Sequence, residues 1–148
     1  MKIFRYLNEE LIFFLDDTNK EEALASLVHK TVQVKHFPDE EKFHQAILER
    51  ERIVSTGIGM GVAIPHAKLA SFQEFFVIIG ILTQGVDWNA LDGAPVRLIF
   101  MIGGPDDKQT EYLQILSCLT MALRDESLRK DMLQATKVDE VIRLFEPY

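Results

Sequence analysis

Apolar positions recur at helical spacing in the first part of the chain. In the stretch TNKEEALASLVHKTV, Leu24, Leu27 and Val28 share one face of a 3.6-residue repeat. Thr18 and Glu21 stand at capping-box spacing where this stretch begins. The pattern predicts a first helix.

A second helical stripe comes after Pro38, a residue that suits the first turn of a helix. Phe43, Ala46 and Ile47 form its apolar face. Continuing this stripe by one helical turn reaches Arg50. We therefore expect the Arg50 guanidinium to point toward the interior side of the helix.

Elsewhere the pattern changes to nearly continuous apolar runs. Residues 74–84 and 94–104 are rich in β-branched and aromatic side chains, which predicts strands covered on both faces. The run LIFFL at residues 11–15 predicts a short strand, and GVAI at residues 61–64 predicts another. Pro65 is expected to stop that last strand from continuing as a central member of the sheet.

Helical spacing returns in the last third of the chain, where we expect helices over residues 106–123, 127–135 and 136–145. Helices before, between and after covered strands predict an α/β layer fold with a mixed or mostly parallel sheet. No linker rich in Ser, Gly or Pro divides the 148 residues, so we expect residues 1–148 to form a single domain.

Composition and charge exclude several classes of protein. Apolar residues make up 47% of the chain, which is enough for a buried core, and the formal net charge of −7 disfavours a nucleic-acid partner. The longest apolar runs are far shorter than the ~18 residues of a membrane helix, and the N-terminus is unlike a signal peptide. We therefore expect a cytoplasmic protein without membrane insertion. The lone Cys118 predicts neither a disulfide nor a zinc site.

The stretch STGIGMGVAIPHAKL holds the candidate chemistry. Gly57, Gly59 and Gly61 allow the backbone to turn its N–H groups toward one point, which is how proteins build anion-binding loops. Pro65 restricts the backbone just before His66. A histidine beside such a loop is a candidate carrier of a phosphoryl group.

Arg50 supports this hypothesis, because an interior guanidinium needs an anionic partner. The alternative is that Arg50 only favours the C-terminal dipole of its helix. A neutral imidazole, with an ordinary pKa of about 6.5, can attack phosphorus directly. Such a transfer depends on positioning and charge neutralisation, so we expect no metal and no cofactor. Thr56 either contacts the phosphate or caps a turn.

Other interpretations of these residues are weaker. The run GIGMG lacks the spacing and the strand–loop–helix context of a dinucleotide-binding loop. His29 and His44 lie off the apolar stripes of their helices, and His36 has no other candidate residue near it. All three are predicted to be ordinary surface residues.

The segment from AILERE through STGIGMGVAIPHAKL resembles the active-site signature of the enzyme IIA components, fructose/mannitol type, of the bacterial phosphotransferase system. This family includes the nitrogen-regulatory enzyme IIA branch. The similarity continues in GVDWNALDGAPVRLIFMI and in the helical C-terminal third, so it covers nearly the whole chain.

The resemblance implies a mannitol-type enzyme IIA fold with a mixed, mostly parallel five-stranded sheet between helices. It also implies that residues 1–148 are one EIIA type 2 domain. His66 would accept a phosphoryl group on Nε2 from the phosphohistidine of an HPr-like carrier. Arg50 would match the family's site arginine. From the residues themselves, Thr56, Gly57, Gly59 and Gly61 are the candidates for binding the phosphate.

One departure from the family pattern is Tyr112, which stands where members commonly place a second histidine. A tyrosine hydroxyl can donate a hydrogen bond to a phosphoryl oxygen but supplies no positive charge. The alternative for Tyr112 is an aromatic residue at the head of an apolar helix face. Either way, the departure is expected to affect the lifetime of the phosphorylated state.

The motif is compatible with more than one function. Tyr112 and the length of the chain favour a nitrogen-regulatory enzyme IIA that controls partner proteins through its phosphorylation state. The alternative is a sugar-specific enzyme IIA that passes phosphate to a IIB domain for transport. A further alternative is a docking module that is never phosphorylated.

Overall fold

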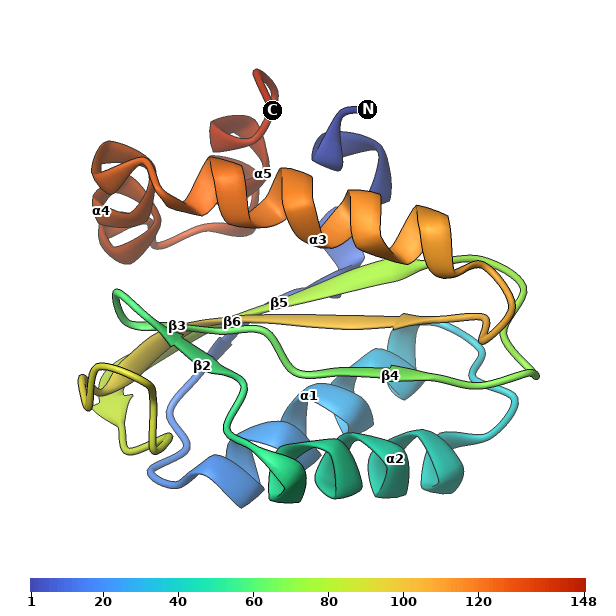
Figure 1. Cartoon of the computed structure of the whole chain (residues 1–148). Helices are drawn as coiled ribbons and strands as arrows, with labels where there is room; N and C mark the ends of the chain where they lie inside the picture. Colours follow the sequence, from blue (N-terminus) through green and yellow to red (C-terminus); the bar gives the residue numbers. More distant parts are fainter.

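A mixed sheet forms the centre of the computed structural model, which describes residues 1–148 (Figure 1). Its strands are β1 (Ile12–Leu15), β2 (Gly57–Gly59), β3 (Val62–Ala63), β4 (His66–Lys68), β5 (Phe76–Val86) and β6 (Val96–Gly104). The main order is β1-β5-β6-β3-β2, and β4 also pairs with β6. The β1/β5, β3/β6 and β4/β6 pairs are parallel, whereas β5/β6 and β2/β3 are antiparallel.

The sheet has six strands rather than five, because two short strands share one position beside β6. β3 pairs with Leu98 and Ile99, whereas β4 pairs with β6 further along, where His66 lies opposite Ile102. Pro65 separates them, since it has no N–H for the ladder, although its carbonyl still accepts from Ile102 N at 2.9 Å. The edge therefore continues beyond Pro65 and places His66 at the start of a strand.

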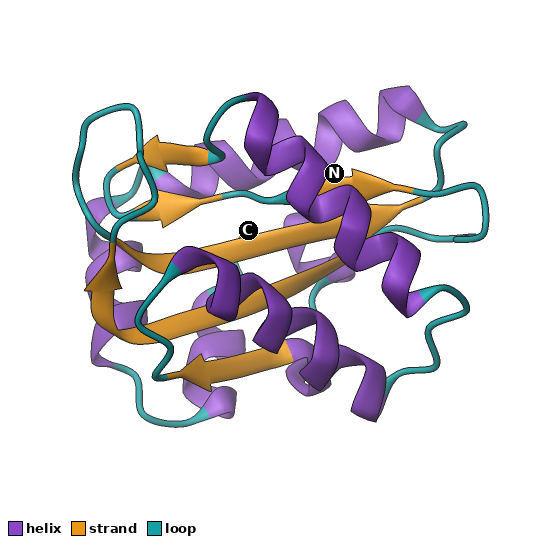
Figure 2. Cartoon of the chain, turned by 90° about the horizontal axis from the view of Figure 1, so that it is seen from below, coloured by secondary structure: helices purple, strands orange, loops and turns teal.

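Helices cover both faces of this sheet (Figures 1 and 2). They are η1 (Ile3–Tyr6), η2 (Glu9–Leu11), α1 (Lys20–Val34), α2 (Glu40–Ile53), α3 (Gln109–Leu123), α4 (Glu126–Gln134) and α5 (Val138–Leu144). α1 and α2 lie on one face, and α3, α4 and α5 lie on the other. This arrangement confirms the predicted α/β layer fold. None of the helices is long and apolar enough to span a lipid bilayer.

The long strands are buried on both faces because successive side chains alternate between two cores. On β6, Leu98 and Phe100 belong to the core under α3, α4 and α5. Ile99 and Met101 belong to the core under α1 and α2. A strand whose alternate side chains pack into two different cores needs apolar side chains at every position, which explains the continuous apolar runs in the sequence.

The start of α1 differs by one residue from the prediction. Asn19, not Thr18, is the N-cap, and its side chain accepts a hydrogen bond from Glu22 N at 2.9 Å. Asparagine is among the strongest N-cap residues, so it takes this position in preference to the threonine before it. The capping box with Glu21 does not form.

Candidate active site

Arg50 and His66 are brought together from two different elements. Arg50 lies in the last turn of α2, and His66 is the first residue of β4. Arg50 Nε donates to His66 Nε2 at 3.2 Å, and Arg50 Nη1 donates to the Val54 carbonyl at 2.8 Å. The expectation that the Arg50 side chain turns inward is therefore confirmed. Its position also lets it bind a carbonyl at the end of its own helix.

Two hydrogen bonds determine the tautomer of His66. Its Nδ1 lies 3.2 Å from the Ile64 carbonyl, which can only accept a hydrogen bond. Nδ1 must therefore carry the proton, and Nε2 keeps the lone pair that accepts from Arg50. Nε2 is thus the ring atom that is available as a nucleophile.

The surroundings favour the neutral form of this ring. Burial lowers the pKa of His66 below its ordinary value of 6.5, the hydrogen bond to the Ile64 carbonyl opposes this shift, and the positive charges of Arg50 and Lys68 lower the pKa further. At neutral pH the imidazole is therefore uncharged, as a nucleophile must be.

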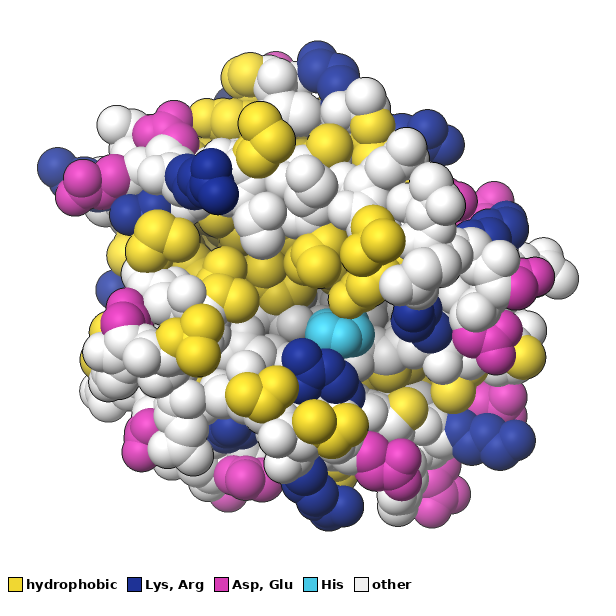
Figure 3. Space-filling view, viewed as in Figure 1, with side chains coloured by type: hydrophobic (Ala, Val, Ile, Leu, Met, Phe, Trp, Pro, Cys, Tyr) yellow, Lys and Arg dark blue, Asp and Glu magenta, His cyan; other side chains and the backbone are white.

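An open pocket of about 490 Å³ lies beside His66. Arg50 and Lys68 supply its positive charges, Glu49 and Asp106 supply its negative charges, and the remaining lining is small or apolar. Figure 3 shows a histidine on this face of the molecule, with basic side chains beside it and hydrophobic side chains covering much of the surface around it. His66 is therefore reached from the surface through this pocket.

The predicted phosphate-binding glycines form a tight hairpin and do not line this pocket. β2 and β3 are joined through Met60 and Gly61, both with positive φ (61° and 74°), as a two-residue hairpin loop requires. Gly59 also has a positive φ of 100°. The amide of Met60 is already bound, since it donates to Asp92 Oδ2 at 3.0 Å. The glycines therefore form the hairpin that precedes β4, and none of them lines the pocket beside His66.

Thr56 is buried and bonded to its neighbours within the protein. Its backbone N and its Oγ1 both donate to the Glu51 carboxylate, at 2.9 and 2.5 Å. Its Oγ1 also accepts from Trp88 Nε1 at 3.1 Å, and Lys20 Nζ donates to Glu51 at 3.0 Å. The Thr56 carbonyl accepts from Ile64 N at 3.0 Å. This network connects the end of α2 to the residue whose carbonyl orients His66.

Tyr112 is the first buried residue of α3, and its ring packs against His66. Its ring centroid is 5.5 Å from that of His66, and its side chain is almost fully buried. Burial raises the pKa of the Tyr112 hydroxyl above its ordinary value of 10.0, and the charge of Arg50 opposes the shift. The residue therefore supplies an aromatic wall and a neutral hydroxyl beside the site.

The other histidines lie apart from this site. His29 and His36 are exposed, and His44 is half-buried on α2, which agrees with their prediction as surface residues. No group of three or more His, Cys, Asp or Glu side chains is placed to hold a metal ion.

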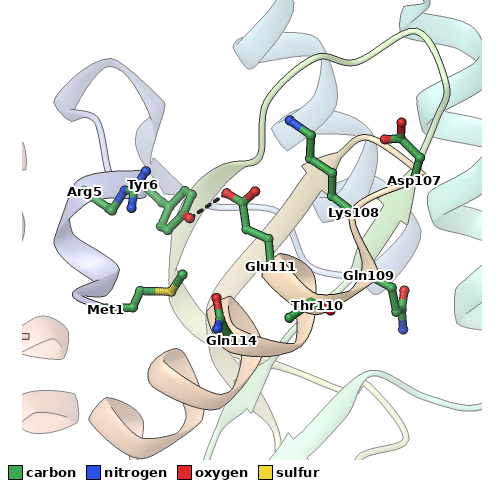
Figure 4. Close-up of a pocket in the computed structure, with 9 residues that line it drawn as sticks. All are labelled: Met1, Arg5, Tyr6, Asp107, Lys108, Gln109, Thr110, Glu111 and Gln114. Carbon is green, nitrogen blue, oxygen red and sulfur yellow. Dashed lines mark hydrogen bonds between the residues drawn. The ribbon is translucent and has the colours of Figure 1, made fainter.

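A larger pocket of about 680 Å³ lies between η1 and the start of α3 (Figure 4). Its lining is mostly polar, and the Tyr6 hydroxyl donates across it to Glu111 Oε2 at 2.6 Å. Burial and Glu111 raise the pKa of Tyr6 to about 12. This pocket contains no histidine, whereas the smaller pocket contains the candidate nucleophile His66.

Two residues of the site were missed by sequence reasoning. Glu51 follows Arg50 directly, and its burial could not be read from a position off the apolar stripe. Lys68 lies two positions after His66. Alternation along a strand places Lys68 on the same side as the histidine, but no strand was predicted directly after Pro65.

Comparison with known proteins agrees with this geometry. The family model described as phosphoenolpyruvate-dependent sugar phosphotransferase system, EIIA 2, matches residues 5–147. A fructose-specific EIIA component from Haloferax volcanii is 36% identical over 116 residues, which are 78% of this chain and 75% of that protein. A nitrogen regulatory protein from Bradyrhizobium diazoefficiens is 30% identical over 124 residues, or 84% and 80% of the two chains.

A fructose-specific EIIABC component from Bacillus subtilis is 35% identical over all of this chain, which spans only 24% of that longer protein. Among solved structures, the nitrogen regulatory protein IIA-Ntr from Neisseria meningitidis superposes with a TM-score of 0.88 at 25% identity, covering 97% of this chain and 98% of that one.

The Escherichia coli enzyme IIAMTL, solved in complex with phosphorylated enzyme IIBMTL, superposes with a TM-score of 0.80 at 27% identity, covering 96% and 98% of the two chains. The fold, the motif and the match over residues 5–147 lead to one assignment. This chain belongs to the EIIA type 2 family of the phosphoenolpyruvate-dependent sugar phosphotransferase system.

Proposed function

We propose that the chain is a phosphocarrier that accepts a phosphoryl group on His66 Nε2 from the phosphohistidine of an HPr-like protein. The observation that carries this proposal is the pair of hydrogen bonds at His66, which leave a neutral ring with its lone pair on Nε2 beside Arg50. Residues 1–148 act as one EIIA type 2 domain, and the exchange takes place in the cytoplasm.

In the transfer, the Nε2 lone pair attacks the phosphorus of the carrier's phosphohistidine. A nitrogen–phosphorus bond forms on His66 while the carrier's nitrogen–phosphorus bond breaks, and the electron pair of the broken bond returns to the carrier imidazole. The proton on Nδ1 stays on His66, and Nδ1 continues to donate its hydrogen bond to the Ile64 carbonyl. Arg50 Nε must leave Nε2 as the new bond forms, and its guanidinium then donates to the phosphoryl oxygens.

The onward step has two candidate forms. In the first, the phosphorylated chain is a nitrogen-regulatory enzyme IIA, and the added charge on the surface around His66 selects which partner proteins bind. The superposition on IIA-Ntr with a TM-score of 0.88 supports this form. In the second, the chain passes its phosphoryl group to a IIB domain for sugar transport. The 36% identity with a fructose-specific EIIA component and the likeness to IIAMTL support the second form.

The test is a reconstituted relay of phosphoenolpyruvate, enzyme I, an HPr-type carrier and the purified chain, followed by intact mass. We expect one acid-labile phosphoryl group on the wild type and on His36→Ala, a control at an exposed histidine, and none on His66→Ala. The absence of incorporation with a competent cognate carrier would contradict the proposal and leave a docking module.

A second stage separates the two forms. Purified phosphorylated chain is mixed with a fructose-type or mannitol-type IIB domain, and the phosphoryl group is followed on both proteins. Rapid loss to the IIB domain favours transport. Retention on His66, together with binding to a protein partner that depends on phosphorylation, favours regulation.

A further inference from the structure

β4 presents a second cation to the pocket beside His66. Side chains two positions apart on a strand leave the same face, so His66 and Lys68 point to the same side while the intervening Ala67 is buried. Lys68 lines the same pocket as Arg50 and His66. Its charge is close enough to lower the pKa of His66.

Two residues of α3 hold the Lys68 side chain over this pocket. Lys68 Nζ donates to Gln109 Oε1 at 2.5 Å and lies 4.6 Å from the centroid of the Tyr112 ring. The first contact uses one of the three N–H donors of the ammonium group, and the second is a cation–π interaction that uses none. Donors are therefore left over for a ligand.

No carboxylate neutralises either cation of the pocket. The only acid–base side-chain contacts within 4.0 Å are Lys20 with Glu51, His29 with Glu40, and Arg143 with Asp139. Glu49 from α2 and Asp106 from the loop before α3 also line the pocket, yet neither reaches Arg50 or Lys68. In a chain with a net charge of −7, two unpaired cations beside one nucleophile form a site suited to an anion.

We propose that Lys68 is a phosphoryl-binding residue that, together with Arg50, donates hydrogen bonds to the oxygens of a phosphoryl group on His66. Tyr112 and Gln109 position the ammonium group. This inference rests on the proposed function and extends it: the positive charge that Tyr112 cannot supply comes from the strand that carries the histidine.

One experiment loads His66 without any protein partner. Phosphoramidate phosphorylates histidine chemically: Nε2 forms a bond to phosphorus, the phosphorus–nitrogen bond of the reagent breaks, and ammonia leaves. The pH titration of the phosphoryl group is then followed by ³¹P NMR in the wild type, Lys68→Gln, Lys68→Arg and the surface control Lys130→Gln. Folding of each variant is checked by its urea midpoint.

Loss of a neighbouring cation disfavours the dianionic phosphoryl group, so Lys68→Gln should raise its apparent pKa by about one unit, equivalent to a tenfold change in its acid dissociation constant. Lys68→Arg should restore the wild-type titration, and Lys130→Gln should leave it unchanged. A titration of Lys68→Gln that matches the wild type would overturn the inference.

The relay gives a second readout. Acceptance of phosphate from the carrier should be about tenfold slower in Lys68→Gln than in Lys130→Gln, because a hydrogen bond to a charged group is lost. A wild-type chain that loads with phosphoramidate, shows the effect of Lys68 by ³¹P NMR and yet accepts nothing from the carrier would contradict the proposed function alone. An unchanged acceptance rate in Lys68→Gln would contradict the inference alone.

Discussion

Arg50 Nε donates to the lone pair of His66 Nε2 across 3.2 Å. The guanidinium is therefore hydrogen-bonded to the same ring atom that we propose accepts the phosphoryl group. This contact keeps Nε2 free of a proton in the resting state. It must also break when a phosphoryl group arrives, because one lone pair cannot serve both. Arg50 is therefore expected to move from the ring to the phosphoryl oxygens during each transfer.

Arg50→Gln should slow phosphoryl acceptance by about 10- to 100-fold, the equivalent of one lost hydrogen bond to a charged group. Arg50→Lys should recover only part of the rate, because lysine has a single nitrogen in place of the two separate guanidinium nitrogens that reach the ring and the Val54 carbonyl. Stopped-quench phosphorylation measures both rates. Arg52→Gln, an exposed position on the same helix, is the control, and full activity of Arg50→Lys would contradict the geometry.

The pH dependence of His66 follows from its lowered pKa. NMR titration should place its midpoint below 6.5, with Nδ1 protonated at neutral pH, and Arg50→Gln should raise the midpoint because a positive charge is removed. Since the pKa is lower in the folded than in the unfolded state, the neutral ring favours folding above pH 6.5, and this contribution is lost as the pH falls through the folded value. Acceptance should decline over the same range. A midpoint above 6.5 would contradict both statements.

Glu51 is expected to be a major contributor to stability. Glu51→Ala leaves the Lys20 ammonium group and the Thr56 donors without a partner in a nearly buried setting, so it should cost about 3–5 kcal/mol of unfolding free energy. Urea unfolding followed by the fluorescence of Trp88 measures the loss. Glu49→Ala, on the same helix and exposed, should stay within about 0.5 kcal/mol of the wild type. Adding Lys20→Met to Glu51→Ala should recover part of the loss, since the unpaired charge is removed.

Substitutions of Thr56 distinguish a structural role of its hydroxyl from direct binding of the phosphate. Thr56→Val removes the hydroxyl that links Glu51 to Trp88 and should cost about 1–3 kcal/mol of stability, whereas Thr56→Ser keeps the hydroxyl. If the role is structural, the folded Thr56→Val variant accepts phosphate at nearly the wild-type rate. A slow but fully stable variant would instead support the expectation of a phosphate contact.

The hairpin before β4 should tolerate its glycine substitutions unequally. Gly61→Ala brings its new Cβ no closer than an ordinary contact with the Pro95 carbonyl oxygen at 3.6 Å and is opposed mainly by its φ of 74°, so it should cost about 1–2 kcal/mol. Gly57→Ala would bring a new Cβ to 2.7 Å from Ala90 Cβ and 2.9 Å from its Cα, which forces the neighbouring loop to shift. We expect the larger loss of stability for Gly57→Ala. Thermal unfolding of the two variants compares them, and the reverse order would contradict this placement of the loop.

Much of the fold could be predicted because its signals are local. The double-sided strands β5 and β6 appear as continuous apolar runs, since both of their faces are buried. The helical stripe through Phe43 and Ile47 also predicted the direction of Arg50, because one turn of a helix is a fixed geometry. The start of α1 was predicted one residue too early, because Thr18 and Asn19 can both serve as caps.

The sequence by itself determined the layer architecture and identified the candidate histidine and its arginine, since periodicity and a short motif are properties of neighbouring residues. Only the tertiary structure decided what these residues touch. It placed β4 in line with β3, turned Lys68 toward the histidine, and joined Glu51 to Thr56 and Trp88. These contacts join segments whose separation along the chain carries no periodic signal, so packing of the helices on the sheet sets them.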